Sequence, residues 1–375
     1  MVKRTTIVGL AALVGAALVG AACSDVAAPR TPDFKVEGGQ LNGTLQENGT
    51  VLIKGFNPTN PHHGDAIVVT FFWVGSTNII QSVTDVLTLP DRPVVGNTYN
   101  LVDYVTAGGI SMATYVATNV QGFPDPYSDA INGDSILAVR ATLSQPVTDG
   151  GLMMKAYSGV YPIYASALGA HSSAFGSGST VTVADPGGIS VGGGSLVYGV
   201  TMANGCCVAP PGGFTNVNNL SDALMWTDAE ELIPGTSGPV DPQWTWFFSR
   251  SSTWLASVLT LGEAVTQLAY TVQPATSLPC PVTMAPVEVT AENAEGNRVT
   301  TYNGNVTIEI GHNAGAVMSG KLFGTLTVKA VNGVARFNDL CIDQPNVPGN
   351  GYTLQSTVPV LNVHKESGAF NIGAL

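Results

Sequence analysis

Charged side chains are scarce in this chain of 375 residues, which carries 14 lysines and arginines and 26 aspartates and glutamates, 11% in all. The formal net charge is −12. Phosphate backbones are bound by strongly basic surfaces, so the small number of cationic side chains argues against a nucleic-acid partner. Hydrophobic residues make up 45% of the chain, enough to build a core, and this excludes a disordered protein.

Long amphipathic helical patterns are also scarce. The best candidate, residues 222–232, is followed directly by Pro234 and Gly235, so we expect at most a short turn there. The chain instead has 44 glycines, 23 prolines and abundant Thr, Val and Ser, a composition that fits extracellular β-sandwiches. Its length after the leader, about 350 residues, allows two or three domains.

The first 23 residues have the three-part layout of a secretory signal: basic Lys3 and Arg4, an uncharged apolar run over residues 7–19, and small residues before Cys23. The apolar run is too short for a stable transmembrane helix, which needs roughly 20 residues. Small side chains before the cleavage site fit the pocket of a signal peptidase. The leader therefore predicts export.

A cysteine directly after such a cleavage site resembles the lipobox of bacterial lipoproteins. In that family the thiol, here that of Cys23, is acylated and tethers the protein to a membrane leaflet; several acyl chains make the anchor stable. Gly20 stands where Leu or Val is usual, so a simply secreted protein is the alternative. Residues 24–32 are small and polar with two prolines, and they read as a flexible tether.

Four cysteines remain once Cys23 is assigned to lipid: Cys206, Cys207, Cys280 and Cys341. An even number in an oxidising compartment indicates disulfides, and three pairings are open. We favour Cys280 with Cys341 because both lie in the C-terminal segment. The neighbours Cys206 and Cys207 form either a strained vicinal disulfide or a pair of thiols. No Cys-x-x-Cys occurs, so a zinc site is not indicated.

Strand signals occur along the whole chain. Residues 66–74 (AIVVTFFWV) form a near-continuous apolar run, as a strand buried on both faces requires. Similar runs cover residues 110–119, 135–143, 152–157, 195–202 and 244–249, and turn residues separate them, among them Gly108-Gly109 and Asp149-Gly150-Gly151. Short strands at this spacing favour a sandwich with Greek-key or jelly-roll wiring.

Two segments resemble known modules. Residues 38–262 carry in order Gly64-Asp65-Ala66-Ile67-Val68-Val69, Gly96-Asn97-Thr98-Tyr99 and Tyr157-Ser158-Gly159-Val160, and they resemble a jelly-roll-like surface module of bacteria and phages. Residues 263–375 carry Val299-Thr-Thr-Tyr-Asn-Gly-Asn-Val-Thr-Ile308 and Val331-Asn-Gly-Val-Ala-Arg-Phe337, and they closely resemble bacterial Ig-like repeats of surface and adhesion proteins. Asn332-Gly333 also predicts a two-residue hairpin turn.

The predicted organisation is therefore a signal peptide (1–22), a lipidated N-terminus with a tether (23–37), a large jelly-roll-like β-sandwich (38–262) and a smaller Ig-like β-sandwich (263–375). The fold class is all-β. The Ig-like resemblance implies a spacer or stalk unit, and the other resemblance implies exposure at the surface without assigning an activity.

Four motifs are candidates for chemistry. Gly188-Ile-Ser190-Val-Gly192 matches the hydrolase nucleophile elbow, which requires a strand before the serine and a helix after it. Here glycines flank the motif and the next apolar run looks like a strand, so a chance match in a Gly- and Ser-rich chain is the plainer interpretation. His62, His63 and Asp65 offer metal ligands, although an exposed loop is the plainer interpretation. An acidic loop containing Asp125, Asp129, Asn132 and Asp134 offers oxygen ligands for Ca²⁺, against a solvated hairpin loop. We expect no other cofactor.

The fourth candidate is an aromatic group in the large domain, made of Trp226, Trp244, Trp246, Phe247, Phe248 and Trp254. Trp226, Trp244 and Trp246 could form a platform on which sugar rings stack. On a strand, however, Trp244 and Trp246 point one way and Phe247 the other, so one face must be core. No spacing singles out a carboxylate pair for glycosidase chemistry.

The leading hypothesis is a non-enzymatic envelope lipoprotein that displays sandwich modules for adhesion, glycan or surface binding, or envelope structure. Its expected partners are a membrane, through the N-terminal lipid, and a surface glycan or protein. One rival is an extracellular hydrolase with an accessory Ig-like domain. Another is the subunit of a surface fibre.

Overall fold

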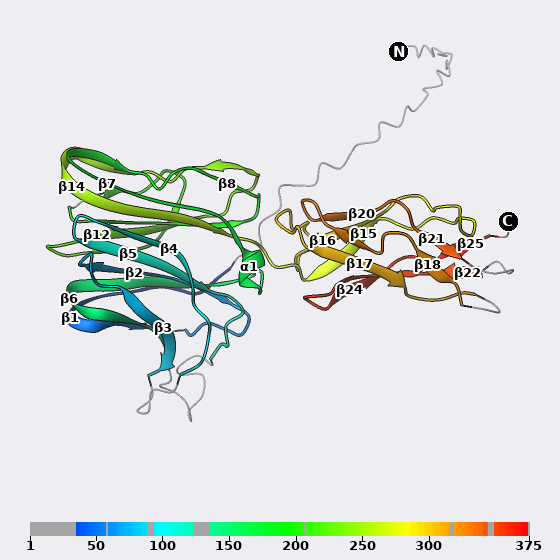
Figure 1. The fold of residues 1–375 in the computed structure, drawn as a ribbon, viewed down its shortest axis with the longest axis horizontal. Coiled ribbons are helices and arrows are strands. Elements are labelled where there is room, and N and C mark those ends of the chain that lie inside the picture. Colours follow the sequence, from blue (N-terminus) through cyan, green and yellow to red (C-terminus); the bar gives the residue numbers. More distant parts are fainter. Residues whose placement is uncertain are drawn as a thin grey trace, which may run out of the picture. The chain divides into compact units, whose positions relative to one another are not determined.

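The computed structural model describes residues 35–57, 59–88, 94–123, 136–205, 208–315, 319–343 and 349–373, with side chains from residue 49 onward. These residues belong to one compact unit, Thr31–Leu375. They form antiparallel strands and one short helix, α1 (Tyr164–Ala167), so the predicted all-β sandwich class is confirmed (Figure 1). Strand pairing within the sheets does not mix residues before 262 with residues after it.

The first half of the large sandwich forms one antiparallel sheet in the order β1-β6-β2-β5-β4, with β3 added to β6. Its strands are β1 (Lys35–Gly55), β2 (Ala66–Val74), β3 (Ile80–Leu87), β4 (Asn100–Ala107), β5 (Ile110–Ala117) and β6 (Leu137–Ser158). Strand β2 matches the predicted run of residues 66–74 and is buried on both faces, as expected.

The second half forms a separate sheet in the order β10-β14-β9-β12-β11, with β7 also paired to β14, and a small β13-β8 sheet. Its strands are β7 (Leu168–Ala184), β8 (Ile189–Val191), β9 (Leu196–Ala203), β10 (Val208–Ala209), β11 (Thr215–Ser221), β12 (Trp226–Leu232), β13 (Gly238–Val240) and β14 (Trp244–Leu261). Residues 222–232, expected to form at most a short turn, therefore include the strand β12.

The two halves repeat one topology. The order β1-β6-β2-β5-β4 becomes β7-β14-β9-β12-β11 when each strand is replaced by its counterpart in the second half. The hydrogen-bond register repeats as well: β2 pairs with β6 from Ala66–Tyr157 to Trp73–Gly150, and β9 pairs with β14 from Leu196–Leu261 to Ala203–Trp254. We infer that the large sandwich is an internal duplication, which the sequence analysis did not detect.

A shared irregularity supports the duplication. The β4–β5 hairpin skips one residue of its register at Val102, and the β11–β12 hairpin skips one at Val217. The two hairpins otherwise align over residues 100–117 and 215–232 without a gap. Because a β-bulge changes the twist of its strand, it is a feature that related structures keep. The two halves share little sequence. One remaining match is Thr50-Val51 in the first half with Thr180-Val181 in the second.

The two sheets pack face to face. Strand β1 lies against β11 and β4 lies against β7, which are equivalent pairs under the exchange of halves. The central strands β2 and β9 meet across the interface, where the hydroxyls of Thr70 and Tyr198 lie 3.3 Å apart. Inner-face residues of both sheets share one hydrophobic core.

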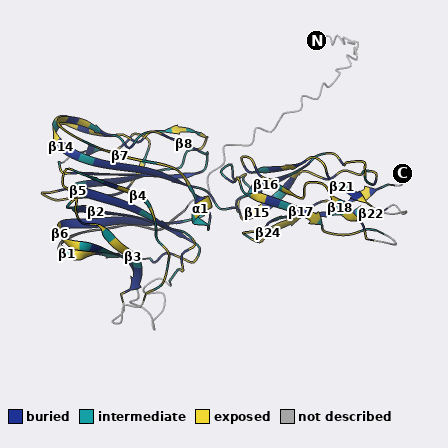
Figure 2. Ribbon diagram, in the orientation of Figure 1, coloured by how far each residue is buried: buried dark blue, intermediate teal, exposed yellow. Residues whose placement is uncertain are grey.

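Each sheet covers its outer face with part of its own chain. In the first half, β3 and the neighbouring ends of β1 and β6 supply Leu87, Leu52 and Leu137, which pack against Ile67 and Phe71 of β2. In the second half, Val181 of β7 and the start of β14 cover the corresponding face. Strand β2 is accordingly dark blue along most of its length in Figure 2.

Asp149-Gly150-Gly151, expected to be a turn, lies inside the continuous strand β6. The expected strands over residues 135–143 and 152–157 are therefore parts of one long strand. A Cβ on Gly150 would lie 3.1 Å from both Leu52 Cδ2 and the Phe72 carbonyl oxygen. The glycine thus permits close packing of the covering segment on the sheet, and it does not reverse the chain.

The C-terminal residues form a second, smaller sandwich with the sheet orders β15-β16-β20 and β19-β17-β23-β24. Its strands are β15 (Gln267–Val272), β16 (Val287–Glu292), β17 (Asn305–Ile310), β18 (Lys321–Phe323), β19 (Thr327–Lys329), β20 (Val334–Phe337), β21 (Cys341–Asp343), β22 (Gly349–Tyr352), β23 (Leu354–Val358), β24 (Val363–Glu366) and β25 (Phe370–Ile372).

Two local predictions for this sandwich are confirmed. Asn332 and Gly333 have φ angles of 49° and 82°, as the predicted two-residue hairpin turn requires, and Val331 bridges to Val334. Cys280 and Cys341 form the expected disulfide. It closes a loop with a sequence separation of 61 residues, for which chain entropy gives a stabilisation of about 4 kcal/mol.

The duplication predicts matched effects of glycine substitutions. Gly64 and Gly194 precede β2 and β9 at equivalent positions, with φ angles of +94° and +85°. Alanine in this left-handed region costs about 1 kcal/mol, so Gly64→Ala and Gly194→Ala should lower the free energy of unfolding by similar amounts in a urea titration. The control is Gly235→Ala, because Gly235 has no positive φ and open space around it. A loss at only one of the two positions would contradict the equivalence.

Candidate functional site

A buried ion pair links the two halves of the large sandwich. Lys155 Nζ on β6 lies 2.8 Å from Glu231 Oε1 on β12, and the Tyr157 hydroxyl donates to Glu231 Oε2 at 2.8 Å. Burial, and secondarily the negative charge of Glu231, raises the pKa of Tyr157 well above its ordinary value. Both carboxylate oxygens are therefore used in holding the sheets together.

A second polar cluster joins β4 to β7 and β14. The Ser257 hydroxyl donates to Asp103 Oδ2 at 2.7 Å, and His171 Nδ1 lies 3.1 Å from Asp103 Oδ1. A catalytic serine is hydrogen-bonded to the histidine that acts as its base. Here the carboxylate stands between the two, and Ser257 is buried. This arrangement is a cross-sheet contact without the geometry of a nucleophile.

Two carboxyl groups lie side by side on the outer face of β12. Asp228 Oδ2 accepts a hydrogen bond of 2.9 Å from Trp244 Nε1, and Asn216 Nδ2 donates to Asp228 at 3.2 Å and to Glu230 at 2.8 Å. Burial raises the pKa of Asp228 to about 6 and that of Glu230 to about 7. The hydrogen bonds from Asn216 and Trp244 lower these pKa values, but by less than burial raises them. The structure thus contains a carboxylate pair that sequence spacing did not single out.

The Trp244 ring covers this pair. Trp244 is completely buried and Trp246 is 6% exposed, while Phe247 and Phe248 are 77% and 85% exposed. A Cβ on Gly199 would lie 3.0 Å from the Trp244 ring, so the glycine leaves room for the indole on the sheet. Trp244 and Trp246 are therefore core residues and do not form an open platform for sugars. Trp226 is half-buried beside them.

Ser190 does not occupy a nucleophile elbow. It lies in the middle of the short strand β8, which pairs with β13, and a turn and strand β9 follow it instead of a helix. The strand expected after the motif is thus present as β9, and the helix that a nucleophile elbow requires is not found there. The Ser190 side chain is exposed and lines a cavity.

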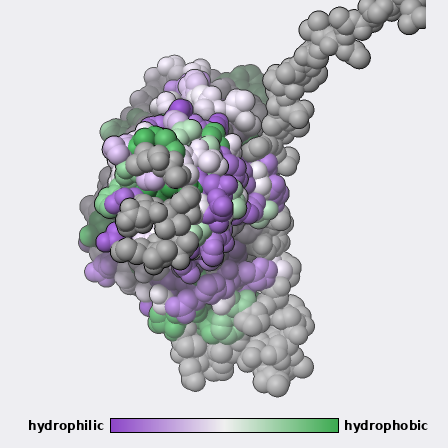
Figure 3. Space-filling model, turned by 90° about the vertical axis from the view of Figure 1, so that its right-hand side faces the viewer, coloured by the Kyte–Doolittle hydropathy of each residue, from purple (hydrophilic) through white to green (hydrophobic). Residues whose placement is uncertain are grey.

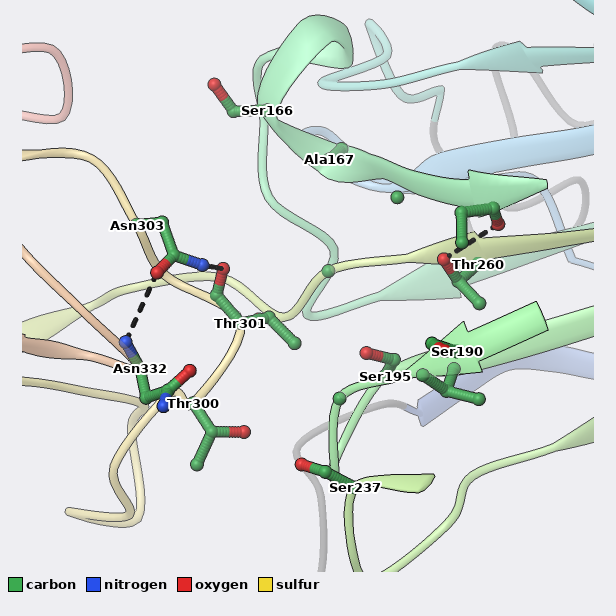
Figure 4. A pocket seen from close by; sticks show the side chains of 15 residues that line it. Ser166, Ala167, Ser190, Ser195, Ser237, Thr260, Thr300, Thr301, Asn303 and Asn332 are labelled. Carbon is green, nitrogen blue, oxygen red and sulfur yellow. Dashed lines mark hydrogen bonds between the residues drawn. The ribbon is translucent and has the colours of Figure 1, made fainter. Parts of the chain in front are cut away.

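This cavity has a volume of about 380 Å³ and contains no charged side chain (Figure 4). Serines and small residues of the large sandwich line one side, and Thr300, Thr301, Asn303 and Asn332 of the smaller sandwich line the other. The Thr300 hydroxyl donates to the Gly193 carbonyl at 2.9 Å, which holds the two sides together. Hydroxyl and amide groups dominate the lining.

The remaining sequence-predicted residues are not gathered into a site. The backbone N–H of His62 donates to Asp65 Oδ2 at 2.7 Å, which closes a turn. Among the residues that the structure describes, no group of three or more His, Cys, Asp or Glu side chains is arranged to hold a metal ion. Cys23, Cys206, Cys207 and the acidic loop with Asp125, Asp129 and Asp134 lie outside the described residues.

No family model matches the chain, and no curated protein matches it significantly.

The raised pKa values predict how stability depends on pH. Because folded Asp228 and Glu230 keep their protons above pH 4, where the unfolded groups ionise, the free energy of unfolding should fall as pH rises from about 4 to about 7. A shift of about 2 units corresponds to roughly 3 kcal/mol for one group. Asp228→Asn combined with Glu230→Gln should flatten this slope in urea titrations at several pH values.

The matched control for this pair is Glu309→Gln, which alters an exposed carboxylate on β17. It should keep the wild-type slope. An unchanged slope in the double variant would show that the pair is ionised in the folded protein throughout this range.

Proposed function

We propose that this protein is exported, anchored by lipid at Cys23, and displays its sandwiches at the cell envelope as a non-enzymatic binding or structural module. The leader and its terminal cysteine support export and anchoring. The Cys280–Cys341 disulfide supports an oxidising compartment outside the cytoplasm. Among the described residues, no helix is long and apolar enough to cross a membrane.

One observation carries the non-enzymatic part of the proposal: the buried groups with catalytic chemistry are engaged in holding the fold together. Glu231 binds Lys155 and Tyr157, Asp103 binds Ser257, and Trp244 caps Asp228. A hydrolase needs a nucleophile or carboxylate that faces substrate with a base in reach. Glu231 and Asp103 instead face partners on the opposite sheet, and Asp228 faces the indole of Trp244 on the outer face of its own sheet.

The surface of the smaller sandwich fits a display role. The view in Figure 3 shows mainly hydrophilic surface, with small separate hydrophobic patches among the described residues. Monomeric soluble proteins commonly have patches of this kind, and they do not mark a large permanent interface.

Lipid anchoring is tested by metabolic labelling with a radioactive or clickable fatty acid in a bacterial host. The wild-type protein should incorporate the label and partition into detergent, because the Cys23 thiol is acylated. Cys23→Ala should lose both properties, while Cys280→Ala, which removes a disulfide cysteine, should keep them. An unlabelled wild-type protein that is found in the medium would contradict the anchor.

The absence of turnover is tested separately with the mature protein on ester, peptide and glycoside substrates. The display role predicts no product above the level of a heat-unfolded sample. Turnover that Ser190→Ala abolishes would overturn it, because Ser190 is the exposed serine of the Gly-x-Ser-x-Gly motif.

A further inference from the structure

A second cavity adjoins the one beside Ser190. The second has a volume of about 290 Å³ and shares with the first the lining residues Ser166, Gly169, Gly262, Thr301 and Asn303. The combined volumes fall within the range of small-molecule sites in proteins, about 300–1,000 Å³. The two cavities flank the segment at Gly262, where the chain leaves the large sandwich.

The first cavity has hydroxyl groups that are free to bind a ligand. Ser195 is 3% exposed, and its side chain makes no hydrogen bond to any described residue. The hydroxyls of Ser166, Ser190 and Thr301 are likewise without a described partner. These hydroxyls can be reached from the cavity, since Ser166 and Ser190 are exposed, so a ligand with donors and acceptors can replace water at them. Figure 4 shows Ser190 and Ser195 on one side of the cavity and Thr301 and Asn303 on the other.

The shape of the cavity depends on close backbone packing. A Cβ on Gly192 would lie 2.7 Å from Thr301 Cγ2 and 3.4 Å from Ser195 Oγ. Glycine at this position therefore lets the β8–β9 turn approach the Thr301 segment while leaving the Ser195 hydroxyl accessible. The wall is completed by the hydrogen bond from Thr300 to Gly193.

Tyrosine side chains form part of the lining of the second cavity. The rings of Tyr161 and Tyr302 stack with centroids 6.1 Å apart and line this cavity together with Glu263. Glu263 Oε1 accepts a hydrogen bond of 2.8 Å from Asn293 Nδ2, so one of its oxygens is already engaged. The combined lining has many neutral polar groups and some apolar aromatic surface.

We infer that these two adjoining cavities bind a neutral carbohydrate of one or two sugar rings. Such a ligand presents many hydroxyls, which match the serines, threonines and asparagines, and C–H faces, which match the tyrosine edges. A strongly charged ligand would be desolvated without a counter-charge in the first cavity. This assignment rests on the proposed display function and names the class of ligand that the displayed module binds.

The test uses the mature chain from Cys23 onward in detergent, probed on an array of unsubstituted neutral oligosaccharides and of sulfated and uronic-acid oligosaccharides. Hits are titrated by calorimetry. Ser190→Leu and Ser166→Leu each fill the cavity at an exposed serine without a described hydrogen bond. The matched control is Ser173→Leu on β7, an exposed serine that lies outside both linings.

A neutral oligosaccharide should bind the wild type and the control. Each cavity variant should bind it at least about tenfold more weakly, a change of about 1.4 kcal/mol. The melting temperature of all three variants should stay at the wild-type value, so that weaker binding is not caused by unfolding. A preference for charged oligosaccharides, no binding by the wild type, or undiminished binding by both cavity variants would overturn the assignment.

Failure of this site differs from failure of the proposed function. If fatty-acid labelling at Cys23 succeeds and no neutral sugar binds, the protein is still a displayed lipoprotein and the cavity assignment alone is wrong. If labelling fails while the cavity variants weaken sugar binding, the ligand class is correct and the anchor is wrong.

Discussion

The large sandwich depends on one constraint, which is that its central strands are buried on both faces. Strands β2 and β9 are buried along almost their whole length. Two sheets packed face to face bury only the inner faces, so each sheet needs an additional cover. The long strands provide it, since the ends of β1 with β6 and of β7 with β14 pack on the outer faces. Burial at about 25 cal/mol per Å² of apolar surface favours this arrangement over an exposed apolar sheet.

The duplication explains where the polar groups of the large sandwich lie. Two copies of one unit would bury identical inner faces, but the present halves have diverged so that Lys155 of one meets Glu231 of the other. Asp103 and Ser257 form a second cross-sheet contact. Replacing one partner of such a pair leaves a buried charge or hydroxyl unsatisfied. These contacts therefore tie the halves together specifically. The cavity lined by Ser195 and Thr301 lies apart from them, and it is where we place the bound ligand.

Much of the fold could be predicted from the sequence, and the failures have physical causes. Residues 66–74 and Asn332-Gly333 were recognised because continuous apolar runs and φ-positive turn pairs are local signals. Strand β12 was missed because it carries Asp228 and Glu230 on one face and Glu231 on the other, so no apolar alternation marks it. The acids are compatible with burial only because Trp244, Asn216 and Lys155 lie nearby in space. Local sequence does not contain that information.

The candidate site was less predictable than the fold. Tryptophans were rightly recognised as concentrated, but their burial depends on Gly199 and on the course of β14. Ser190 drew attention through a hydrolase motif, yet its importance in the structure is as part of a cavity lining. That lining combines residues from 166 to 332, and no single segment of the chain indicates it. The sequence did not reveal the topological repeat either. The strand register and the position of the bulge agree between the two halves, whereas most of their side chains differ.

The central claim is that the ion pair of Lys155 and Glu231 joins the two halves of the large sandwich. The most direct test is a double-mutant cycle on Lys155→Met and Glu231→Leu, measured by urea unfolding at neutral pH. The account predicts that each single variant loses about 3 kcal/mol and that the double variant loses clearly less than the sum, with a coupling of roughly 1–3 kcal/mol. Additive losses, with no coupling between Lys155 and Glu231, would contradict it.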